Sequence, residues 1–371
     1  CGEAQIGELA RMLIRAGVTR IAPVAGIHDG YDGEPHDGVY ALQRLSRRVS
    51  VSVAAGLLPS HATLDPAPVP VTLCGQPIMD KERFKGQPFN AAAQLYFRSG
   101  GSSGTPVLSG YSYGDFHRQM RATADGLFAA GLDPARDRVM NLFFCGGLYG
   151  GFLSFAKVLE LLDIPHLPMG APADDDYRDI AELIISQRVT VLMGMPSTLH
   201  RLFLNERERL QAYGGITKVF LGGEHLSEPS RALLRRCGVT SIRSAIYGSV
   251  DAGPLGHACQ ATGDGIFHLM NDTQHLEIVA LDADEPVVGN QVGRLLFTSI
   301  AREAQNVQRY DVGDTGRWVS GACACGLASP RFELLQRHGK LIRIGTDFIS
   351  LSELAVHLQV PFQVLLDHAP D

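Results

Sequence analysis

Strand-like and helix-like apolar runs take turns through the middle of the chain, and this alternation limits the fold more than any other feature. Residues 116–132 have the apolar periodicity of a helix, 138–144 form a short apolar run typical of a buried strand, and 151–163 again favour a helix. Continuous apolar strands separated by helices indicate a mainly parallel sheet that is covered on both faces. The sequence therefore predicts an α/β fold.

The same pattern continues as far as residue 248. Further helices and strands are expected, in alternation, at 179–188, 189–195, 197–213, 216–223, 227–238 and 241–248. Pro196 with Ser197, and Ser227 with Glu228 and Pro229, are residues typical of helix N-termini. Each of these helices therefore has a recognisable start directly after or shortly after a strand.

Beyond Gly253 the pattern changes to short strands with alternating side chains. Residues 275–281 and 292–300 alternate in this way, which suits an antiparallel subdomain. A Pro-rich stretch before the alternating region reads as an extended linker. The predicted divisions are an N-terminal segment at 1–56, the linker at 57–76, a core at 77–336 and a C-terminal piece at 337–371.

Composition excludes several classes of function. The net charge is -6, with 19% charged and 45% hydrophobic residues, so the chain lacks the basic field that nucleic-acid binding needs. No window approaches about twenty uninterrupted apolar residues, and the start at Cys1 has no signal-peptide pattern, so we expect no membrane partner and a cytoplasmic location. The 7 cysteines are too dispersed to suggest a disulfide framework. The sequence leaves the oligomeric state open, with a homodimer as one option.

A run of small residues directly follows an apolar segment. It consists of Ser99, Gly100, Gly101, Ser102, Ser103 and Gly104. Glycine backbones and serine hydroxyls can form a nest of donors that suits phosphate oxygens, whereas a flexible linker or a tight hairpin turn is the alternative. The run is not a Walker A loop, because no Lys-Ser or Lys-Thr follows Gly104, and it lacks the spacing of a dinucleotide fingerprint.

Four later stretches decide between these alternatives. They lie in order at 193–202, 219–234, 244–256 and 309–318. Together with the Gly/Ser run they resemble the adenylate-forming enzymes, specifically the branch of the phenylacetate–coenzyme A ligases. The resemblance extends from about residue 77 to 355, and it implies a large adenylate-forming N-terminal domain whose C-terminal lid is mostly missing here. It also implies that ATP and Mg²⁺ activate a carboxylic acid to acyl-AMP with release of pyrophosphate.

The resemblance assigns a nucleotide site. The Gly/Ser run would grip the ATP phosphates, with Ser102 and Ser103 as its catalytic members, although the lysine that relatives often carry at Thr105 or Val107 is absent. The other nucleotide residues implied are Gly222, Gly223 and Glu224 along the adenine, Tyr247 stacked on it, Gly248 and Ser249 or Val250 near the α-phosphate, Asp314 at the ribose hydroxyls and Arg337 at the hinge.

Asp251 takes the place of the family's usual glutamate as the Mg²⁺ ligand. A metal must neutralise charge on the α-phosphate while a carboxylate oxygen attacks it, and a carboxylate ligand suits Mg²⁺. Because Asp is one methylene shorter than Glu, binding through a water is an option. A routine turn aspartate is the alternative.

Residues 141–151 correspond to the segment that forms the acyl pocket in relatives. The expected pocket residues are Phe144, Gly146, Gly147, Tyr149 and Met193. Aromatic faces beside glycines would leave a flat slot for an aryl carboxylic acid, with Phe144 nearer the ligand and Phe143 in the core. Plain core packing is the alternative.

A cysteine and histidine set falls where many relatives hold a structural zinc ion. Its expected members are Cys259, Cys323 and Cys325 with one histidine, His268, and His257 is the alternative for that position. Thiolate and imidazole ligands suit tetrahedral Zn²⁺, whereas buried free thiols are the alternative.

Residues 17–51 resemble the end of the fatty acyl-CoA reductases of bioluminescence systems. An adenylating body joined to a reductase-like end implies carboxylate reduction, in which the activated acyl group passes to a partner reductase. The chain also resembles the short adenylating proteins of luciferase operons and of griseoluteic acid (phenazine antibiotic) biosynthesis, and the expected aryl-lined pocket fits the latter better. Two alternatives stay open: a full acyl-CoA ligase with coenzyme A as acceptor, and a nucleotide-binding scaffold that has lost its chemistry.

Overall fold

The computed structural model describes residues 76–99, 106–173, 176–223, 226–300 and 302–337, together with the backbone of short strands on either side. These strands are β1 (Arg20–Ile21), parallel to β2 (Ser50–Val51), and β17 (Leu341–Ile344), antiparallel to β18 (Asp347–Ser350). Apart from them, the predicted N-terminal segment, linker and C-terminal piece lie outside the described residues. No helix within the described ranges has the length and apolar character needed to cross a membrane.

The alternating region forms a five-stranded parallel sheet in the order β6-β5-β7-β8-β9. Its strands are β5 (Val139–Asn141), β6 (His166–Pro168), β7 (Val191–Gly194), β8 (Lys218–Leu221) and β9 (Ser241–Ser244). The connecting helices are α5 (Gly151–Leu161), α6 (Tyr177–Ser186), α7 (Pro196–Asn205), α8 (Arg207–Tyr213) and α9 (Glu228–Arg236). This arrangement confirms the predicted α/β fold.

Successive residues of the central strands enter different hydrophobic cores. On β7, Val191 and Met193 pack in one core with α5, whereas Leu192 packs in the other with α6, α7 and α9. Val219 and Phe220 of β8 divide between the two cores in the same way. Because both faces of the sheet are buried at its centre, β7 and β8 appear in the sequence as apolar runs without alternation.

Two predicted elements are divided in the structure. The helix predicted at 197–213 is broken at Glu206, where φ is -112° and ψ is 26°, so α7 and α8 are separate. The strand predicted at 241–248 becomes β9 of the parallel sheet and β10 (Tyr247–Ser249) of a second sheet. Ala245 still donates to Leu221 O of β8 at 2.6 Å, and the chain changes sheets immediately after it.

The second sheet has seven antiparallel strands in the order β10-β11-β12-β16-β15-β14-β13, as the alternating pattern predicted. Its further strands are β11 (Gly253–His257), β12 (Ile266–Leu269), β13 (Gln274–Val279), β14 (Gly293–Ser299), β15 (Tyr310–Val319) and β16 (Arg331–Arg337). Phe267, Phe297 and Phe332 form the aromatic centre of its core.

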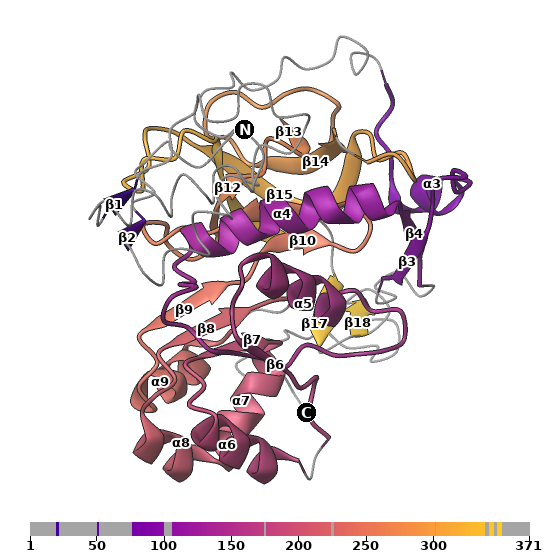
Figure 1. The fold of residues 1–371 in the computed structure, drawn as a ribbon. Coiled ribbons are helices and arrows are strands. Elements are labelled where there is room, and N and C mark those ends of the chain that lie inside the picture. Colours follow the sequence, from indigo (N-terminus) through magenta and orange to yellow (C-terminus); the bar gives the residue numbers. More distant parts are fainter. Residues whose placement is uncertain are drawn as a thin grey trace, which may run out of the picture.

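Helix α4 (Tyr113–Ala129) lies between the two sheets and contacts α5 on one side and β11 on the other (Figure 1). It follows a hairpin of β3 (Leu95–Arg98) and β4 (Leu108–Tyr111), and the short helix α3 (Lys81–Lys85) precedes that hairpin. Gly126 permits the close approach of β11, since a Cβ there would lie 2.5 Å from His257 Cβ. The helix therefore joins the two halves of the fold, and the candidate site lies along it.

Candidate active site and metal centre

A cavity of about 440 Å³ opens where α4, the β3–β4 hairpin, the ends of the parallel strands and the second sheet meet. Its lining is mostly apolar and aromatic on the side of α4 and α5, and it carries glycines, Ser249 and Asp251 on the side of the second sheet. An apolar cavity with few, converging polar groups is the usual form of a small-molecule site.

Asp251 lies in the turn after β10 and is only 5% exposed. Ser109 of β4 donates a hydrogen bond to its Oδ1 at 3.2 Å, and Tyr310 of β15 donates to its Oδ2 at 2.8 Å. Each carboxylate oxygen therefore has one hydroxyl partner and retains acceptor capacity. Asp251 also lines the cavity, and a carboxylate held in this way fits a hard divalent cation such as Mg²⁺.

Arg302 supports the same turn from behind. Its guanidinium lies 3.9 Å from the centroid of the Tyr111 ring, donates to Gly110 O at 2.8 Å and also donates to the main-chain oxygen of Asp251. The Tyr111 hydroxyl donates to Val250 O at 2.6 Å. Burial raises the pKa of Tyr111, so this hydroxyl keeps its proton. The backbone on both sides of the Asp251 side chain is thus held by buried groups.

Glycine and serine residues line the cavity beside Asp251. Gly222, Gly223, Gly248 and Ser249 all lie there, as does Ser99 at the start of the Gly/Ser run. Ser99 closes the base of this hairpin loop, because its N–H donates to Val107 O at 2.8 Å and its Oγ accepts from Val107 N at 3.1 Å. The rest of the run, Gly100, Gly101, Ser102, Ser103 and Gly104, lies outside the described residues, and so does Glu224.

Tyr247 has a different placement from the predicted stacking position. Its side chain is 8% exposed and packs against Phe267 and Phe332, with ring centroids at 5.4 and 5.7 Å, and it does not line the cavity. Its hydroxyl donates to Asp314 Oδ2 at 2.9 Å. The reason is strand alternation, since the side chain of β10 that faces the aromatic core cannot also face the cavity.

Asp314 lies next to the cavity wall without being part of it. Asp311, Val312 and Gly313 of the same strand line the cavity, and Asp314 follows them. In the sheet register Asp314 is opposite Arg337, the predicted hinge residue, whose side chain lies outside the described residues. The structure therefore brings the backbones of these two predicted residues together.

The predicted acyl pocket is only partly placed at the cavity. Tyr149 lines it, but Phe144 is 46% exposed, and Phe144, Gly146 and Gly147 are not among the lining residues. Met193 is completely buried in the core next to α5. Phe143, expected in the core, both packs there and lines the cavity, stacked on Phe155 at 4.6 Å. Phe143 and Phe144 follow the end of β5, where the chain bends, and only the ring of Phe143 is buried.

Several lining residues have no counterpart in the sequence analysis. Helix α4 contributes Phe116, Gln119, Met120 and Thr123, whose spacing places them on one face of the helix. Their periodicity was the available signal, but it does not tell which neighbour that face meets. Lys81 of α3 is the cation among the described lining residues, and nothing in its local sequence indicates this.

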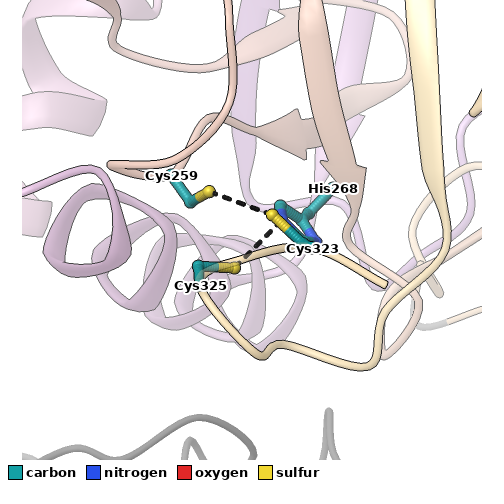
Figure 2. A group of neighbouring side chains, drawn as sticks. All are labelled: Cys259, His268, Cys323 and Cys325. Atoms are coloured by element: carbon teal, nitrogen blue, oxygen red, sulfur yellow. Dashed lines mark hydrogen bonds between the residues drawn. The ribbon is translucent and has the colours of Figure 1, made fainter. Parts of the chain in front are cut away.

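The four predicted zinc ligands come together outside the cavity (Figure 2). Cys259 follows β11, His268 lies on β12, and Cys323 and Cys325 lie between β15 and β16. Their ligand atoms all lie within 4.8 Å of one another, with Cys259 Sγ 3.7 Å from Cys323 Sγ and Cys325 Sγ 3.4 Å from His268 Nε2. Tetrahedral Zn²⁺ ligands are separated by roughly 3.8 Å for two sulfurs and roughly 3.5 Å for sulfur and nitrogen.

Neighbouring polar groups make hydrogen bonds to the histidine and to the cysteine sulfurs of this cluster. His268 Nδ1 lies 3.0 Å from Ser329 Oγ, which leaves Nε2 directed at the cysteines. Backbone N–H groups donate to sulfur, from Ala261 to Cys259 at 3.3 Å and from Leu327 to Cys325 at 3.5 Å. Burial raises the pKa of the Cys325 thiol to about 12. Burial also acts to raise the pKa of Cys323, but hydrogen bonds from Cys325 and Cys259 outweigh it, and that pKa is lowered.

The amino-acid sequence is similar to those of known coenzyme A ligases. The chain is 28% identical over 270 residues to a phenylacetate-coenzyme A ligase of Thermus thermophilus, covering 71% of this chain and 59% of that protein. It is 30% identical over 230 residues to the phenylacetate-coenzyme A ligase of Escherichia coli, covering 60% of this chain and 51% of that protein. The chain thus spans between about half and three fifths of the length of these relatives.

The fold is similar to that of solved coenzyme A ligase structures. A crystal structure of 2-hydroxyisobutyryl-CoA ligase, in complex with 2-HIB-AMP and CoA, has a TM-score of 0.66 and 19% sequence identity, and the match covers 76% of this chain and 63% of that one. The described core has the fold of the N-terminal domain of adenylate-forming enzymes. Residues 1–48 separately match the family model described as acyl-CoA reductase (LuxC).

Proposed function

We propose that the protein uses ATP to adenylate an aryl carboxylic acid, forming acyl-AMP and releasing pyrophosphate. The observation that carries this proposal is the cavity itself, in which one wall presents Asp251 with Gly248 and Ser249, and the other presents Phe116, Phe143 and Phe155. The first wall suits a nucleotide phosphate with its cation, and the second suits an aromatic ring. Similarity to the two phenylacetate-coenzyme A ligases supports the reaction class.

In the proposed reaction, a carboxylate oxygen of the acid attacks the α-phosphorus of ATP, and the bond to the β-phosphate breaks. Mg²⁺, when bound, would neutralise charge on the phosphates. Asp251 would hold that cation, and its two hydroxyl partners, Ser109 and Tyr310, keep the carboxylate in one orientation. Ser102 and Ser103 of the Gly/Ser run would donate to the phosphates, and Lys81 would add positive charge at the cavity wall. Positioning and charge neutralisation are the main requirements of this chemistry.

The acceptor of the acyl group divides the proposal into two versions. In the first, an acyl acceptor such as a partner reductase consumes the acyl-AMP, which the LuxC match at residues 1–48 favours. Secondary metabolism, such as phenazine antibiotic biosynthesis, would be its setting. In the second, coenzyme A is the acceptor, as the names of the relatives suggest. Release of AMP that requires added coenzyme A favours the second version.

The test is acid-dependent exchange of labelled pyrophosphate into ATP, measured with a panel of aryl and fatty acids. We expect exchange with at least one aryl acid, and we expect Asp251→Asn to reduce it by about 100-fold. Asp282→Asn, at an exposed aspartate outside the cavity, is the matched control and should exchange like the unaltered protein. Absence of exchange with every acid would overturn the proposal and leave the scaffold alternative.

A structural Zn²⁺ ion forms part of the proposal. Cys259, His268, Cys323 and Cys325 would hold it between β11, β12 and the β15–β16 connection, where it would join strands of the second sheet. Such an ion stabilises the fold and takes no part in the adenylation.

A further inference from the structure

The inference concerns a buried polar side chain in the wall of the cavity. Gln119 of α4 is 2% exposed and lines the cavity between Phe116, Met120 and Thr123 of the same helix. Within the described part of the chain, no hydrogen bond reaches its side-chain amide. The Thr123 hydroxyl donates to the main-chain oxygen of Gln119 at 2.8 Å and leaves the amide unused.

Two other buried glutamines near the same turn use their side-chain amides in internal hydrogen bonds. Gln274 Nε2 donates to Ala252 O and Pro254 O, both at 3.1 Å, although its Oε1 has no partner. Gln305 Oε1 accepts from Gly110 N at 3.0 Å and from Arg302 Nη2 at 3.1 Å. Buried side-chain amides are normally paired in this way, because an unpaired one loses its hydrogen bonds to water without replacement. Gln119 differs from these two residues in that it borders the cavity.

Gly253 makes room for the Gln119 amide at the cavity wall. This residue has φ +83°, and a Cβ on it would lie 2.8 Å from both Oε1 and Nε2 of Gln119. The amide therefore lies directly against the start of β11, two residues beyond Asp251. One amide offers an acceptor oxygen and two N–H donors in a single plane. Apart from Thr123 and Ser154, the side chains that α4 and α5 add to the lining are apolar, among them Phe116, Met120 and Phe155.

We infer that Gln119 recognises a hydrogen-bonding substituent on the ring of the acid, so that the preferred substrates are aryl acids carrying a hydroxyl, amino or carbonyl group. This inference rests on the proposed function, because it names the class of acid. A ring held by apolar side chains gains little selectivity from them alone, whereas a site built to hydrogen-bond a substituent strongly rejects analogues that lack it. Gln119 is thus a specificity-determining residue.

The test compares acids that differ only at one polar atom. The probes are the three monohydroxybenzoates, each paired with the methylbenzoate of the same substitution pattern, which has nearly the same shape. Pyrophosphate exchange gives kcat/KM for each acid. For at least one pair we expect the unaltered protein to prefer the hydroxyl acid by about 10- to 100-fold.

Gln119→Leu should reduce that preference to within about 3-fold while exchange with the methyl acid is retained. Gln119→Met, which keeps an unbranched side chain of similar length, guards against misfolding of the leucine variant. Gln211→Leu, at an exposed position of α8, is the matched control and should keep the full preference. A role for Gln119 in holding the carboxylate, or a purely structural role, would lower kcat/KM equally for both members of each pair.

The inference would be overturned if Gln119→Leu lowered kcat/KM equally for both acids of a pair, or if the unaltered protein used both acids equally well. Either result would leave the proposed function standing. Failure of the proposed function has a different signature, namely no exchange with any acid. In that event calorimetric binding of the same pairs decides the inference, because recognition by Gln119 predicts tighter binding of the hydroxyl acid without turnover. Equal binding of both members would overturn it.

Discussion

The hydroxyl of Tyr310 donates a hydrogen bond to Oδ2 of Asp251 at 2.8 Å and joins β15 to the turn after β10. Ser109 holds the other carboxylate oxygen from β4, so three separate segments converge on one side chain. This geometry restricts the carboxylate to one orientation at the cavity wall. Removing one of these hydroxyls should therefore change how Asp251 holds a cation.

Tyr310→Phe should weaken the cation site without removing its ligand. We expect about a 10-fold lower pyrophosphate exchange rate and a higher Mg²⁺ concentration for half-saturation, since a buried charge-assisted hydrogen bond is lost. Titration of exchange activity against Mg²⁺ measures both quantities. Tyr113→Phe is the control, because Tyr113 is 62% exposed at the start of α4. An unchanged Mg²⁺ dependence in Tyr310→Phe would argue against this role for the hydroxyl.

The metal cluster predicts one tightly bound zinc ion per chain. Cys325→Ser should lose most of that zinc and lower the free energy of unfolding by at least about 2 kcal/mol, because a site that forms only on folding stabilises the folded state. Elemental analysis of the whole chain measures the loss of zinc, and denaturant unfolding measures the loss of stability. Cys145→Ser, at an exposed cysteine outside the cluster, should keep its zinc. Substoichiometric zinc in freshly purified protein would count against the site.

Asp115 should contribute stability that depends on pH. Burial acts to raise its pKa, but hydrogen bonds from the backbone of Ser112, Glu303 and Ala304 outweigh this, so the pKa lies below the ordinary value of 3.8. A lowered pKa means that the contribution is complete above pH 3.8 and is lost as the pH falls through the folded-state value.

Asp115→Asn should therefore lower the free energy of unfolding by about 2 kcal/mol at pH 7, and the difference from the unaltered protein should shrink below about pH 4. Urea unfolding at a series of pH values measures it. The exposed variant Asp282→Asn should show little difference at any pH. A gap for Asp115→Asn that stays constant down to low pH would contradict the role of its charge.

Gly248→Ala should disturb the junction of β10 and β11. A Cβ at this position would lie 2.6 Å from Gly253 O and 3.1 Å from Pro254 Cα, both of which are backbone atoms that cannot rotate away. We expect a loss of about 2 kcal/mol in the free energy of unfolding, together with weaker acid binding. Gly263→Ala, where an added Cβ meets nothing within 4 Å, is the control. Thermal unfolding of both variants compares them directly, and equal stabilities would refute the expected clash.

The sequence by itself determined the class of fold. Apolar periodicity is a local property that reports which faces of an element are buried, so the alternating region and the change beyond Gly253 predicted a parallel and an antiparallel sheet. The resemblance to relatives also pointed to the three cysteines of the metal cluster, whereas the structure groups His268, and not His257, with them.

Only the tertiary structure decided which side chains meet. Asp251 finds its partners 142 residues away in Ser109 and 59 residues away in Tyr310, and no local pattern records such a pairing. Tyr247 faces the aromatic core because a strand side chain points to one side of the sheet only, and Phe144 is exposed in the loop after β5. The sequence does not say which of these side chains meets the cavity. Gln119 belongs to a helix that the sequence predicted, yet its place at the cavity follows from how α4 packs between two sheets.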